Sequence, residues 1–322
     1  MISEHLHLLA ADNKPPKVSI GMPVYNGEKF IRQALDSLLA QTFTDFELII
    51  SDNASSDQTR QICLEYAAKD KRIHYHRNDI NIDGIANFNH VLGLAVGQYF
   101  MWVAYDDKWE PAFIASLEKS LNANPRAALA FCRFVTMDEE GNLKQTFKTN
   151  WAKVFSRSKF WQFASMVLLD ELVTRKANHI YGLIRRDVLL ECGGMVILPD
   201  VSYSGEDILT LLLILSKWDF TIVDEVLFNY RVRPQPVRRD EPLAGYVWQR
   251  IFRQKSGHQG SLLLFFIRNH AYHTNMRKLI LSKTSLPLFE KFLLSLAIAL
   301  KEFWFPISFL PLGVLRELRI LR

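Results

Sequence analysis

Short apolar runs alternate with segments of helical periodicity over the first part of the chain. The runs, which predict β-strands, cover residues 17–22, 46–50, 72–76, 98–104 and 127–134. Between them, apolar side chains recur at helical spacing over 28–40, from a cap at 55–57 to about 69, over 84–96, and from about Pro111. This alternation predicts an α/β fold in which a mostly parallel sheet carries helices on both faces.

The second half of the chain has a less regular pattern. Residues 138–178 are polar and mixed, which predicts loop with one helix near 158–169. The pattern further predicts a strand at 179–184, a short helix at 185–193, a very apolar helix at 205–217, and one or two strands at 220–230. We therefore expect an N-terminal tail (1–16), one α/β domain (17–230) and a helical C-terminal region (231–322).

Polar side chains follow three of the expected strands at the point where each strand ends. Tyr25 and Asn26 follow the first strand, Asp52 ends the second, and Asp106 and Asp107 follow the fourth. Ligands of open parallel sheets bind outside the carboxyl ends of the strands. The sequence therefore predicts one ligand site at that edge of the sheet.

The acidic residues near this edge have both a chemical and a structural interpretation. Asp106 and Asp107 can hold a hard cation through carboxylate oxygens, or they can cap a solvated loop. Asp52 can accept hydrogen bonds from a nucleotide base or ribose, or it can form an Asx turn before the next helix. Asp207, which follows Glu206 at the start of the helix 205–217, can act as a general base or simply cap that helix.

Charge is distributed unevenly along the chain. The formal net charge is +5, but residues 231–322 carry 16 Lys and Arg against 5 Asp and Glu, so residues 1–230 are net acidic. A basic, apolar tail suits anionic lipid or phosphate groups. It is accompanied by no DNA- or RNA-binding motif, so no nucleic-acid partner is expected.

Two segments of the tail could meet a membrane. The first is a basic cluster at 231–255, which suits a lipid-linked diphosphate or an anionic leaflet, unless it is a solvated loop. The second, 292–315, contains Lys301, Glu302, Pro306 and Pro311, so it is not expected to span a bilayer. We predict a helix lying in the membrane interface; the alternative is a helix packed on the α/β domain or on a second subunit.

Cysteine content and the N-terminus indicate the compartment. Cys63, Cys132 and Cys192 are few and far apart, with no disulfide framework or zinc spacing. The first 16 residues lack the pattern of a signal peptide. A cytoplasmic protein, peripheral at the cytoplasmic face of the membrane, is expected.

An ordered series of motifs resembles the family-2 glycosyltransferases over about residues 17–231. The series comprises PVYN (23–26) with Glu28, LLAQTFTDFELIISDNASSDQT (38–59), Asn87 in GIANFNHVL, AVGQYFMWVAYDDKWEP (95–111) and GED (205–207). The resemblance implies the GT-A fold, which is Rossmann-like, and an inverting transfer from a nucleotide sugar that uses Mn²⁺ or Mg²⁺.

The resemblance also implies roles for individual residues. Asp52 would contact the nucleotide base, Asp106 and Asp107 would hold the metal and the ribose, and Asp207 would be the catalytic base. The remaining residues implied in nucleotide-sugar binding are Pro23, Tyr25, Asn26, Glu28 and Asn87. Ala104 and Tyr105 stand where many relatives have a further acid, so the division of metal and ribose roles between Asp106 and Asp107 stays open.

The sequence thus predicts an enzyme that moves a single sugar from a nucleoside-diphosphate sugar to a hydroxyl group. The acceptor would be a glycan or a lipid-linked glycan in bacterial surface polysaccharide synthesis. The alternative is a non-catalytic, nucleotide-sugar-binding or scaffold member of the same fold. Other nucleotide enzymes, such as nucleotidylyltransferases and dehydrogenases, require a Gly-rich phosphate loop after the first strand. The corresponding segment here, MPVYNGEKF, has one glycine, which disfavours these classes. The donor sugar, base, linkage and oligomeric state stay open.

Overall fold

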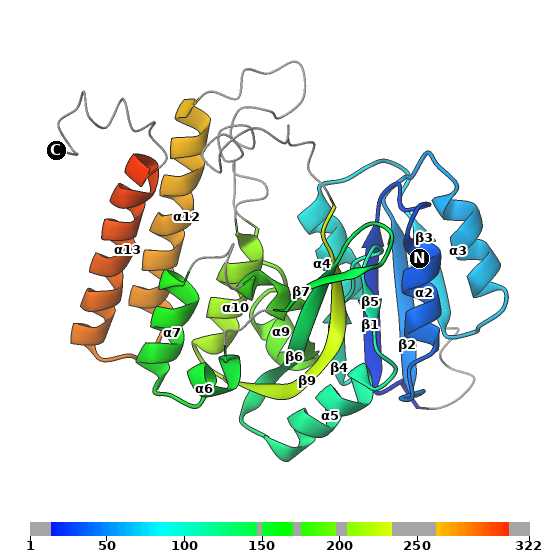
Figure 1. Cartoon of the computed structure of the whole chain (residues 1–322), viewed down its shortest axis with the longest axis horizontal. Helices are drawn as coiled ribbons and strands as arrows, with labels where there is room; N and C mark the ends of the chain where they lie inside the picture. The colour runs from blue at the N-terminus through cyan, green and yellow to red at the C-terminus, as the bar shows by residue number, and fades with distance from the viewer. Residues whose placement is uncertain (1–13, 147–149, 170–174, 198–204, 234–261, 309–322) are drawn as a thin grey trace.

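The computed structural model describes residues 14–146, 150–169, 175–197, 205–233 and 262–308, and these residues form a mixed sheet covered by helices (Figure 1). The strands run in the order β3-β2-β1-β4-β8-β6-β9-β5, with β7 beside β6. Their bounds are β1 Val18–Val24, β2 Phe46–Asp52, β3 Ile73–Arg77, β4 Tyr99–Trp102, β5 Lys108–Trp109, β6 Ala127–Met137, β7 Leu143–Thr146, β8 Leu183–Arg185 and β9 Asp219–Arg231.

The helices follow the predicted alternation closely in the first half of the chain. They are α2 Ile31–Leu39, α3 Thr59–Ala67, α4 Gly84–Leu94, α5 Phe113–Ala123, α6 Trp151–Phe155, α7 Lys159–Leu168, the 3₁₀ helix η2 Lys176–Tyr181, α9 Arg186–Glu191, α10 Glu206–Leu215, α12 Leu262–Lys283 and α13 Leu288–Ser308.

The parallel strands place their carboxyl ends at one edge of the sheet. β1 pairs in parallel with both β2 and β4, with Val24 opposite Asp52 and Gly21 opposite Trp102. β6 and β9 are also parallel to each other, and Met137 pairs with Arg231 at their carboxyl ends. β8 runs antiparallel to β4 and to β6, and Leu183 at its start pairs with Ala130 of β6.

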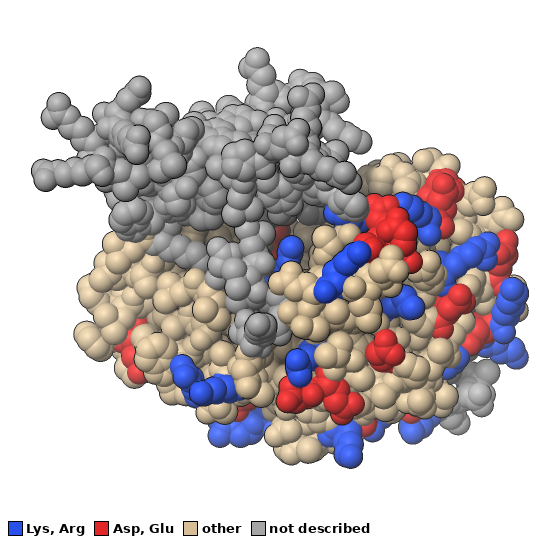
Figure 2. All heavy atoms as spheres, viewed as in Figure 1, with Lys and Arg blue, Asp and Glu red and all other residues tan. Residues whose placement is uncertain are grey.

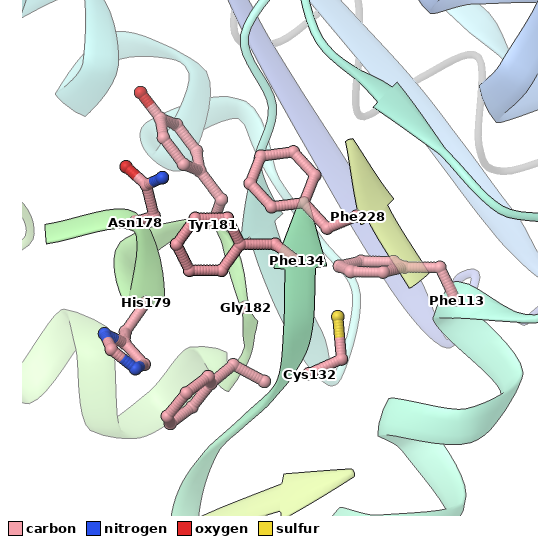
Figure 3. Close-up of a pocket in the computed structure, with 9 residues that line it drawn as sticks. Phe113, Cys132, Phe134, Asn178, His179, Tyr181, Gly182 and Phe228 are labelled. Atoms are coloured by element: carbon pink, nitrogen blue, oxygen red, sulfur yellow. The ribbon is translucent and has the colours of Figure 1, made fainter. Parts of the chain in front are cut away.

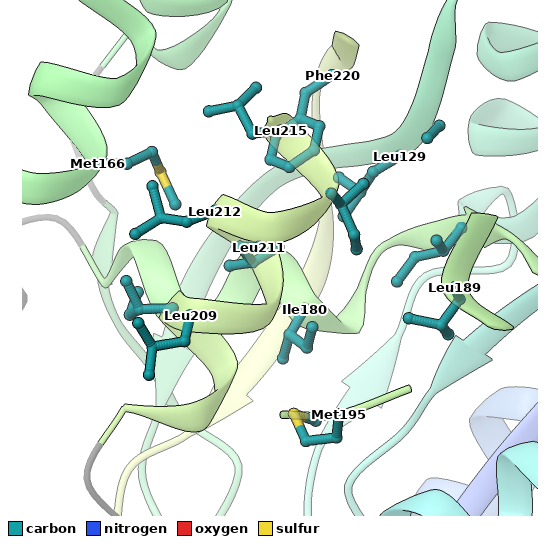
Figure 4. Packing of buried hydrophobic residues seen from close by; sticks show 14 of the residues in the cluster. Leu129, Met166, Ile180, Leu189, Met195, Leu209, Leu211, Leu212, Leu215 and Phe220 are labelled. Atoms are coloured by element: carbon teal, nitrogen blue, oxygen red, sulfur yellow. The ribbon is translucent and has the colours of Figure 1, made fainter. Parts of the chain in front are cut away.

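Two hydrophobic layers enclose the sheet, which confirms the predicted α/β fold with helices on both faces. Tyr99 and Met101 of β4 face the layer that contains α2, α3 and α5, whereas Phe100 and Trp102 face the layer that contains α4, α9 and α10. The second layer is the larger. In it α10 is buried among β6, α7 and η2 through leucines that include Leu209, Leu211 and Leu212 (Figure 4).

The predicted strand at 179–184 is wrong over most of its length. Residues 176–181 wind into η2, and β8 begins only at Leu183. Between the two elements stands Gly182, where a Cβ atom would collide with the carbonyl oxygen of Ala130 in β6. The chain approaches β6 closely at this glycine before it enters the sheet. Within 138–178, β7 and α6 were not expected.

The C-terminal helices α12 and α13 lie side by side at the end of the molecule far from α3 (Figure 1). Met276 and Ile280 of α12, and Leu294 and Ile298 of α13, are buried in the larger hydrophobic layer. The described part of the segment 292–315 therefore packs one face on the α/β domain, as one of the alternatives predicted, and residues 309–315 lie outside the described residues. None of the helices in the described ranges is sufficiently long and apolar to cross a bilayer.

Candidate functional site at the carboxyl edge of the sheet

The loops that follow β1 and β2 are bonded to each other. Asn26, in the left-handed region at φ 50°, donates its amide hydrogen to Ser55 Oγ over 2.9 Å and accepts one from the amide of Ser56, also over 2.9 Å. Glu28 Oε2 accepts from the amide of Gln58 at 2.8 Å. The predicted donor-site residues Asn26 and Glu28 thus fix the shape of this edge.

Two further predicted donor-site residues lie beside them. Pro23 is buried in β1 opposite Ser51. Tyr25 follows the strand, and its ring is largely exposed. The exposed ring is the one part of this segment that presents an aromatic face to a ligand.

Asp52 is fully buried at the end of β2, and both of its carboxylate oxygens are engaged. Oδ1 accepts from the amide of Ser55 at 2.8 Å, and Oδ2 accepts from the hydroxyl of Tyr75 at 2.7 Å. The guanidinium of Arg77 lies 3.5 Å from Oδ2. Burial, and then the Asp52 carboxylate, raise the pKa of Tyr75 above its usual range, so Tyr75 stays a hydrogen-bond donor.

Asn87, on α4, belongs to a buried amide network beside Asp52. Its Oδ1 accepts from Ser51 Oγ at 2.6 Å and from Asn78 Nδ2 at 3.2 Å, and its Nδ2 donates to the Ser51 carbonyl at 3.0 Å. Asn53 continues the network by accepting from Asn78. Asn87 therefore holds α4 against the end of β2.

Asp107, in the turn between β4 and β5, has one satisfied and one unsatisfied oxygen. Oδ1 accepts from the amide of Arg231 at 2.7 Å. Oδ2 is buried without a hydrogen-bond partner, and the residue is 1% exposed. Burial, and then the charge of Asp106, raise the pKa of Asp107 well above its usual range.

An orphaned carboxylate oxygen of this kind fits a divalent cation. No group of three or more His, Cys, Asp or Glu side chains suited to a metal occurs among the residues that the structure describes. Mg²⁺-type sites commonly use one or two carboxylates and complete their shell with water and substrate phosphates. The pair Asp106–Asp107 matches that pattern.

Arg231 is rigidly held next to the acidic pair. Its guanidinium donates to the carbonyls of Asp106, Asp138 and Glu139 at 2.6, 2.8 and 2.7 Å, and to Gln33 Oε1 at 2.8 Å. It is only 3% exposed. The sequence predicted a solvated or lipid-facing basic cluster at 231–255. Arg231 does not belong to such a cluster, because it is buried and closes the turn that carries Asp106 and Asp107.

Arg233 extends the same strand end toward solvent. Its Nε donates to Asp106 Oδ2 at 2.8 Å, its Nη2 contacts the same oxygen, and Nη2 also donates to the Tyr105 hydroxyl at 2.9 Å. The remaining basic residues predicted for this cluster, Arg238, Arg239, Arg250, Arg253 and Lys255, lie outside the described residues.

Asp207 is the second residue of α10, which begins at Glu206 after Gly205 at φ 98°. Asp207 Oδ1 accepts from the amide of Ile208 at 2.7 Å, and the N-cap position itself is taken by Gly205, which has no side chain to cap the helix. Burial raises the pKa of Asp207 despite that bond, the charge of Glu206 raises it further, and the positive charge of Lys176 opposes the change. The carboxyl group is therefore suited to take up a proton.

Tyr181 is influenced by the charge of Asp207 and by the charges of the acidic pair. Burial raises the pKa of the Tyr181 hydroxyl well above its usual range, and the charges of Asp107, Asp106 and Asp207 add to this effect. Three carboxylates from two distant parts of the chain thus act on one phenol at the end of η2. Asp52 lies at the same edge, with β1 between its strand and β4.

An aromatic cluster packs around Tyr181. A cavity of about 10 Å³ is lined by Phe113, Phe131, Phe134, Tyr181 and Phe228, among others (Figure 3). A cavity of this size is at the limit for one water molecule and cannot hold a nucleotide. In Figure 3 the Tyr181 hydroxyl points away from His179 and Gly182, so this cavity belongs to the support of the site.

Sequence reasoning missed the roles of Tyr75, Lys176, Tyr181 and Arg231 in this arrangement. The segment Asn229-Tyr-Arg-Val-Arg233 offered a signal, because it closes a strand whose carboxyl end lies at the predicted ligand edge. η2 gave no such signal, since its sequence resembles a strand.

Comparisons with known proteins agree with this geometry. A profile of glycosyl transferase family 2 matches residues 19–191. An uncharacterized glycosyltransferase of Rickettsia typhi is 31% identical over 128 residues, which span 39% of this chain and 39% of that protein. An uncharacterized glycosyltransferase of Methanocaldococcus jannaschii is 27% identical over 228 residues, 67% of this chain and 71% of the relative. The putative teichuronic acid biosynthesis glycosyltransferase TuaG of Bacillus subtilis is 28% identical over 224 residues, 68% and 81%.

Solved structures share the fold at low sequence identity. Residues 1–349 of S. aureus TarS, in complex with UDP-GlcNAc, superpose with a TM-score of 0.62 and 18% identity, covering 90% of this chain and 73% of that chain. The mannosyltransferase PcManGT from Pyrobaculum calidifontis, in complex with GDP-Man and Mn²⁺, gives a TM-score of 0.51 at 15% identity, covering 94% and 93%. The fold is that of the GT-A enzymes.

Proposed function

We propose that this chain, which belongs to glycosyl transferase family 2, transfers a single sugar from a nucleoside-diphosphate sugar to an acceptor hydroxyl group with inversion at the anomeric carbon. The observation that supports the proposal is that the charges of Asp107, Asp106 and Asp207 all raise the pKa of one buried hydroxyl group, that of Tyr181. Family membership alone would also allow a binding protein, whereas this arrangement supplies both an acid pair for a diphosphate site and a separate base.

The donor nucleotide is assigned to the edge formed by β1 and β2. Tyr25 presents its exposed ring there, and Asn26 and Glu28 hold the two loops together. Asp52 and Asn87 would fix the base and support the donor from the buried side. The UDP-GlcNAc complex of TarS and the GDP-Man complex of PcManGT are in keeping with a nucleotide-sugar donor.

Asp107 and Asp106 are assigned to the divalent cation, Mn²⁺ or Mg²⁺. The unsatisfied Oδ2 of Asp107 supplies one ligand, and Asp106 supplies a carboxylate next to it. When bound, such a cation neutralises the charge that develops on a departing diphosphate. The Mn²⁺ in the PcManGT complex supports a cation in this fold.

Asp207 is assigned to the acceptor side. Its carboxylate would accept the proton of the attacking hydroxyl, and the pKa raised by burial makes it a better base than a solvated aspartate. Attack from the side opposite the leaving diphosphate gives inversion. The relationship to TuaG, a putative teichuronic acid biosynthesis enzyme, supports a glycan or lipid-linked glycan of a bacterial surface polysaccharide as the acceptor.

We further assign the protein to the cytoplasmic face of a membrane, through the outer face of α13. That face consists of large apolar side chains that are exposed: Leu288, Phe289, Phe292, Leu293, Leu296 and Leu300. In Figure 2 the surface at this end, below the grey atoms, is mostly uncharged, whereas the end with α2 and α3 carries mixed charges. Residues 303–315 carry no charged side chain, and Arg316, Arg319 and Arg322 follow. Apolar and basic groups together suit an anionic bilayer.

Release of nucleoside diphosphate from a panel of UDP-, GDP- and dTDP-sugars, with and without Mn²⁺, tests the transfer. Wild-type protein should release nucleotide from at least one of these donors, and this release should require Mn²⁺. Asp207→Asn should reduce the rate of release by about 10²–10⁴-fold. Asp207→Asn should still bind the nucleoside diphosphate, as judged by its melting temperature. If wild type binds a diphosphate yet cleaves no donor with any candidate acceptor, the non-catalytic alternative is correct.

A further inference from the structure

We propose that Arg233 is a mobile counter-ion that neutralises Asp106 in the empty site and passes to the donor's diphosphate when the divalent cation takes Asp106. This inference rests on the proposed function and deepens it, because it names the residue that couples cation binding to diphosphate binding. Its basis is the contrast between two arginines, Arg231 and Arg233, at the end of β9.

Arg233 is held by few and accessible bonds. Its side chain is 45% exposed, whereas that of Asp106 is 14% exposed. The guanidinium bonds to a single carboxylate oxygen of Asp106 and to the Tyr105 hydroxyl. It also lies 5.3 Å from the centre of the Tyr105 ring and 5.7 Å from that of Phe30. A half-exposed ion pair of this kind is weak and can be exchanged.

Arg231 cannot move in this way. Its guanidinium donates hydrogen bonds to three backbone carbonyls and to Gln33, and its backbone amide donates to Asp107. The positive charge of Arg231 is therefore a fixed part of the turn. Arg233, two residues further along, is the cation of this pair that can change partners.

Electrostatics gives the exchange a direction. Asp106 and Asp107 are adjacent carboxylates in a poorly solvated turn, so an empty site favours a positive charge on Asp106. A divalent cation that binds both carboxylates competes with Arg233 for Asp106 Oδ2. The released guanidinium would then be free to bind the phosphates of the donor, and its planar fork suits two phosphate oxygens.

The exchange makes opposite predictions for two ligands. Removing Arg233 removes a competitor of the cation, so Mn²⁺ alone should bind Arg233→Gln about threefold to fivefold more tightly than wild type. The same change removes a charged hydrogen-bond donor to the diphosphate, so UDP and GDP at saturating Mn²⁺ should bind about 10–100-fold more weakly. By linkage, the synergy between Mn²⁺ and nucleotide should shrink.

Calorimetric titrations of Mn²⁺ alone, and of UDP and GDP with Mn²⁺, test these predictions on the full chain. Arg233→Lys keeps the charge without the fork and should fall between wild type and Arg233→Gln for the nucleotide. Tyr105→Phe, which removes one bond that holds Arg233, should also tighten Mn²⁺. Arg133→Gln is the matched control, because Arg133 is an exposed arginine paired with Asp224 away from the site, and it should change neither affinity.

The inference is overturned if Arg233→Gln weakens Mn²⁺, or if it leaves both affinities at the wild-type values while its melting temperature without ligand is unchanged. Should Arg233→Gln not fold, Tyr105→Phe and Arg233→Lys decide by the same criteria. If Arg233→Gln shows the expected changes in Mn²⁺ and UDP affinity relative to wild type, but wild type cleaves no donor, the proposed transfer is refuted and the exchange stands. If wild type cleaves the donor but Arg233→Gln does not show tighter Mn²⁺ and weaker nucleotide binding, the exchange is refuted and the proposed transfer stands.

Discussion

Three carboxylates of the site illustrate how local surroundings assign different tasks to the same side chain. Asp52 is saturated by Ser55 and Tyr75, so it serves as a fixed acceptor in the wall of the site. Asp107 has a buried oxygen without a partner, and Asp207 has a pKa raised by burial. The unpartnered oxygen favours a cation at Asp107, and the raised pKa favours proton uptake at Asp207.

Replacing Asp107 should separate stability from cation binding. Asp107→Asn removes a buried negative charge that lies next to the charge of Asp106, so the cation-free protein should gain about 1–3 kcal/mol in its free energy of unfolding. The variant should lose the rise in melting temperature that Mn²⁺ gives wild type. Denaturant unfolding at pH 7, with and without Mn²⁺, measures both effects. A variant that is less stable without the cation, and is still stabilised by Mn²⁺, would contradict the assignment.

The raised pKa of Asp207 should appear in the pH dependence of the rate. The ionised carboxylate is the active form of a base, so kcat/KM should rise with pH through the pKa of Asp207, above the range of an ordinary aspartate. Because the charge of Lys176 lowers this pKa, Lys176→Met should move the acid limb to higher pH. The profile of kcat/KM from pH 4 to 8 tests this. An acid limb that shifts to lower pH in Lys176→Met would refute the assignment.

At the scale of elements, α12 supports the turn that carries Asp207. Gly205 adopts φ 98°, and a Cβ atom at this position would lie 2.6 Å from the Tyr272 ring of α12. The ring therefore rests directly on the turn before α10. A helix of the C-terminal region thereby helps to position a residue of the candidate site.

Tyr272→Ala should therefore impair catalysis from outside the site. Loss of the ring should lower stability by about 2–4 kcal/mol and, by loosening the start of α10, should lower kcat about tenfold. The KM for the donor should stay near wild type, because the edge formed by β1 and β2 is unchanged. Leu281→Ala, at an exposed position of the same helix, is the control. Steady-state kinetics decide the matter: a change in donor KM alone would contradict this role.

The elements also show which parts of the fold the pattern could predict. β1, β2 and β4 were predictable, since their apolar runs end at polar residues and each strand is buried on both faces. η2 was not, because His179-Ile180-Tyr181 has the apolar pattern of a strand, and the close approach of Gly182 to β6 that follows it is a tertiary contact. Strand ends and a helix start in the sequence predicted Asp106, Asp107 and Asp207 as site residues. Arg231 was missed because its role depends on carbonyls of Asp138 and Glu139, which no local pattern encodes.

At the scale of the whole molecule, the uneven charge and the outer face of α13 point the same way. Leu294 and Ile298 bury one side of α13 in the core, while the opposite side presents the apolar residues of its outer face to the surroundings. Leu281 of α12 and Trp161 of α7 add exposed apolar surface on neighbouring helices. Contiguous exposed apolar surface of this kind marks an interaction site. The net positive charge of residues 231–322 favours an anionic bilayer as the occupant.

Sedimentation with vesicles tests this docking. Wild type should bind vesicles that contain phosphatidylglycerol, and bind less to pure phosphatidylcholine or at high salt, because basic residues contribute through screened charge. Phe292→Glu with Leu296→Glu should weaken binding at least about tenfold, since two apolar side chains no longer leave water. Leu143→Glu, an exposed leucine on β7, is the control and should bind as wild type does. Donor cleavage by the double variant should persist, because neither Phe292 nor Leu296 is among the residues assigned to the candidate site. If the double variant instead converts a dimer to a monomer and wild type ignores vesicles, the face joins two copies of the chain and the membrane assignment is wrong.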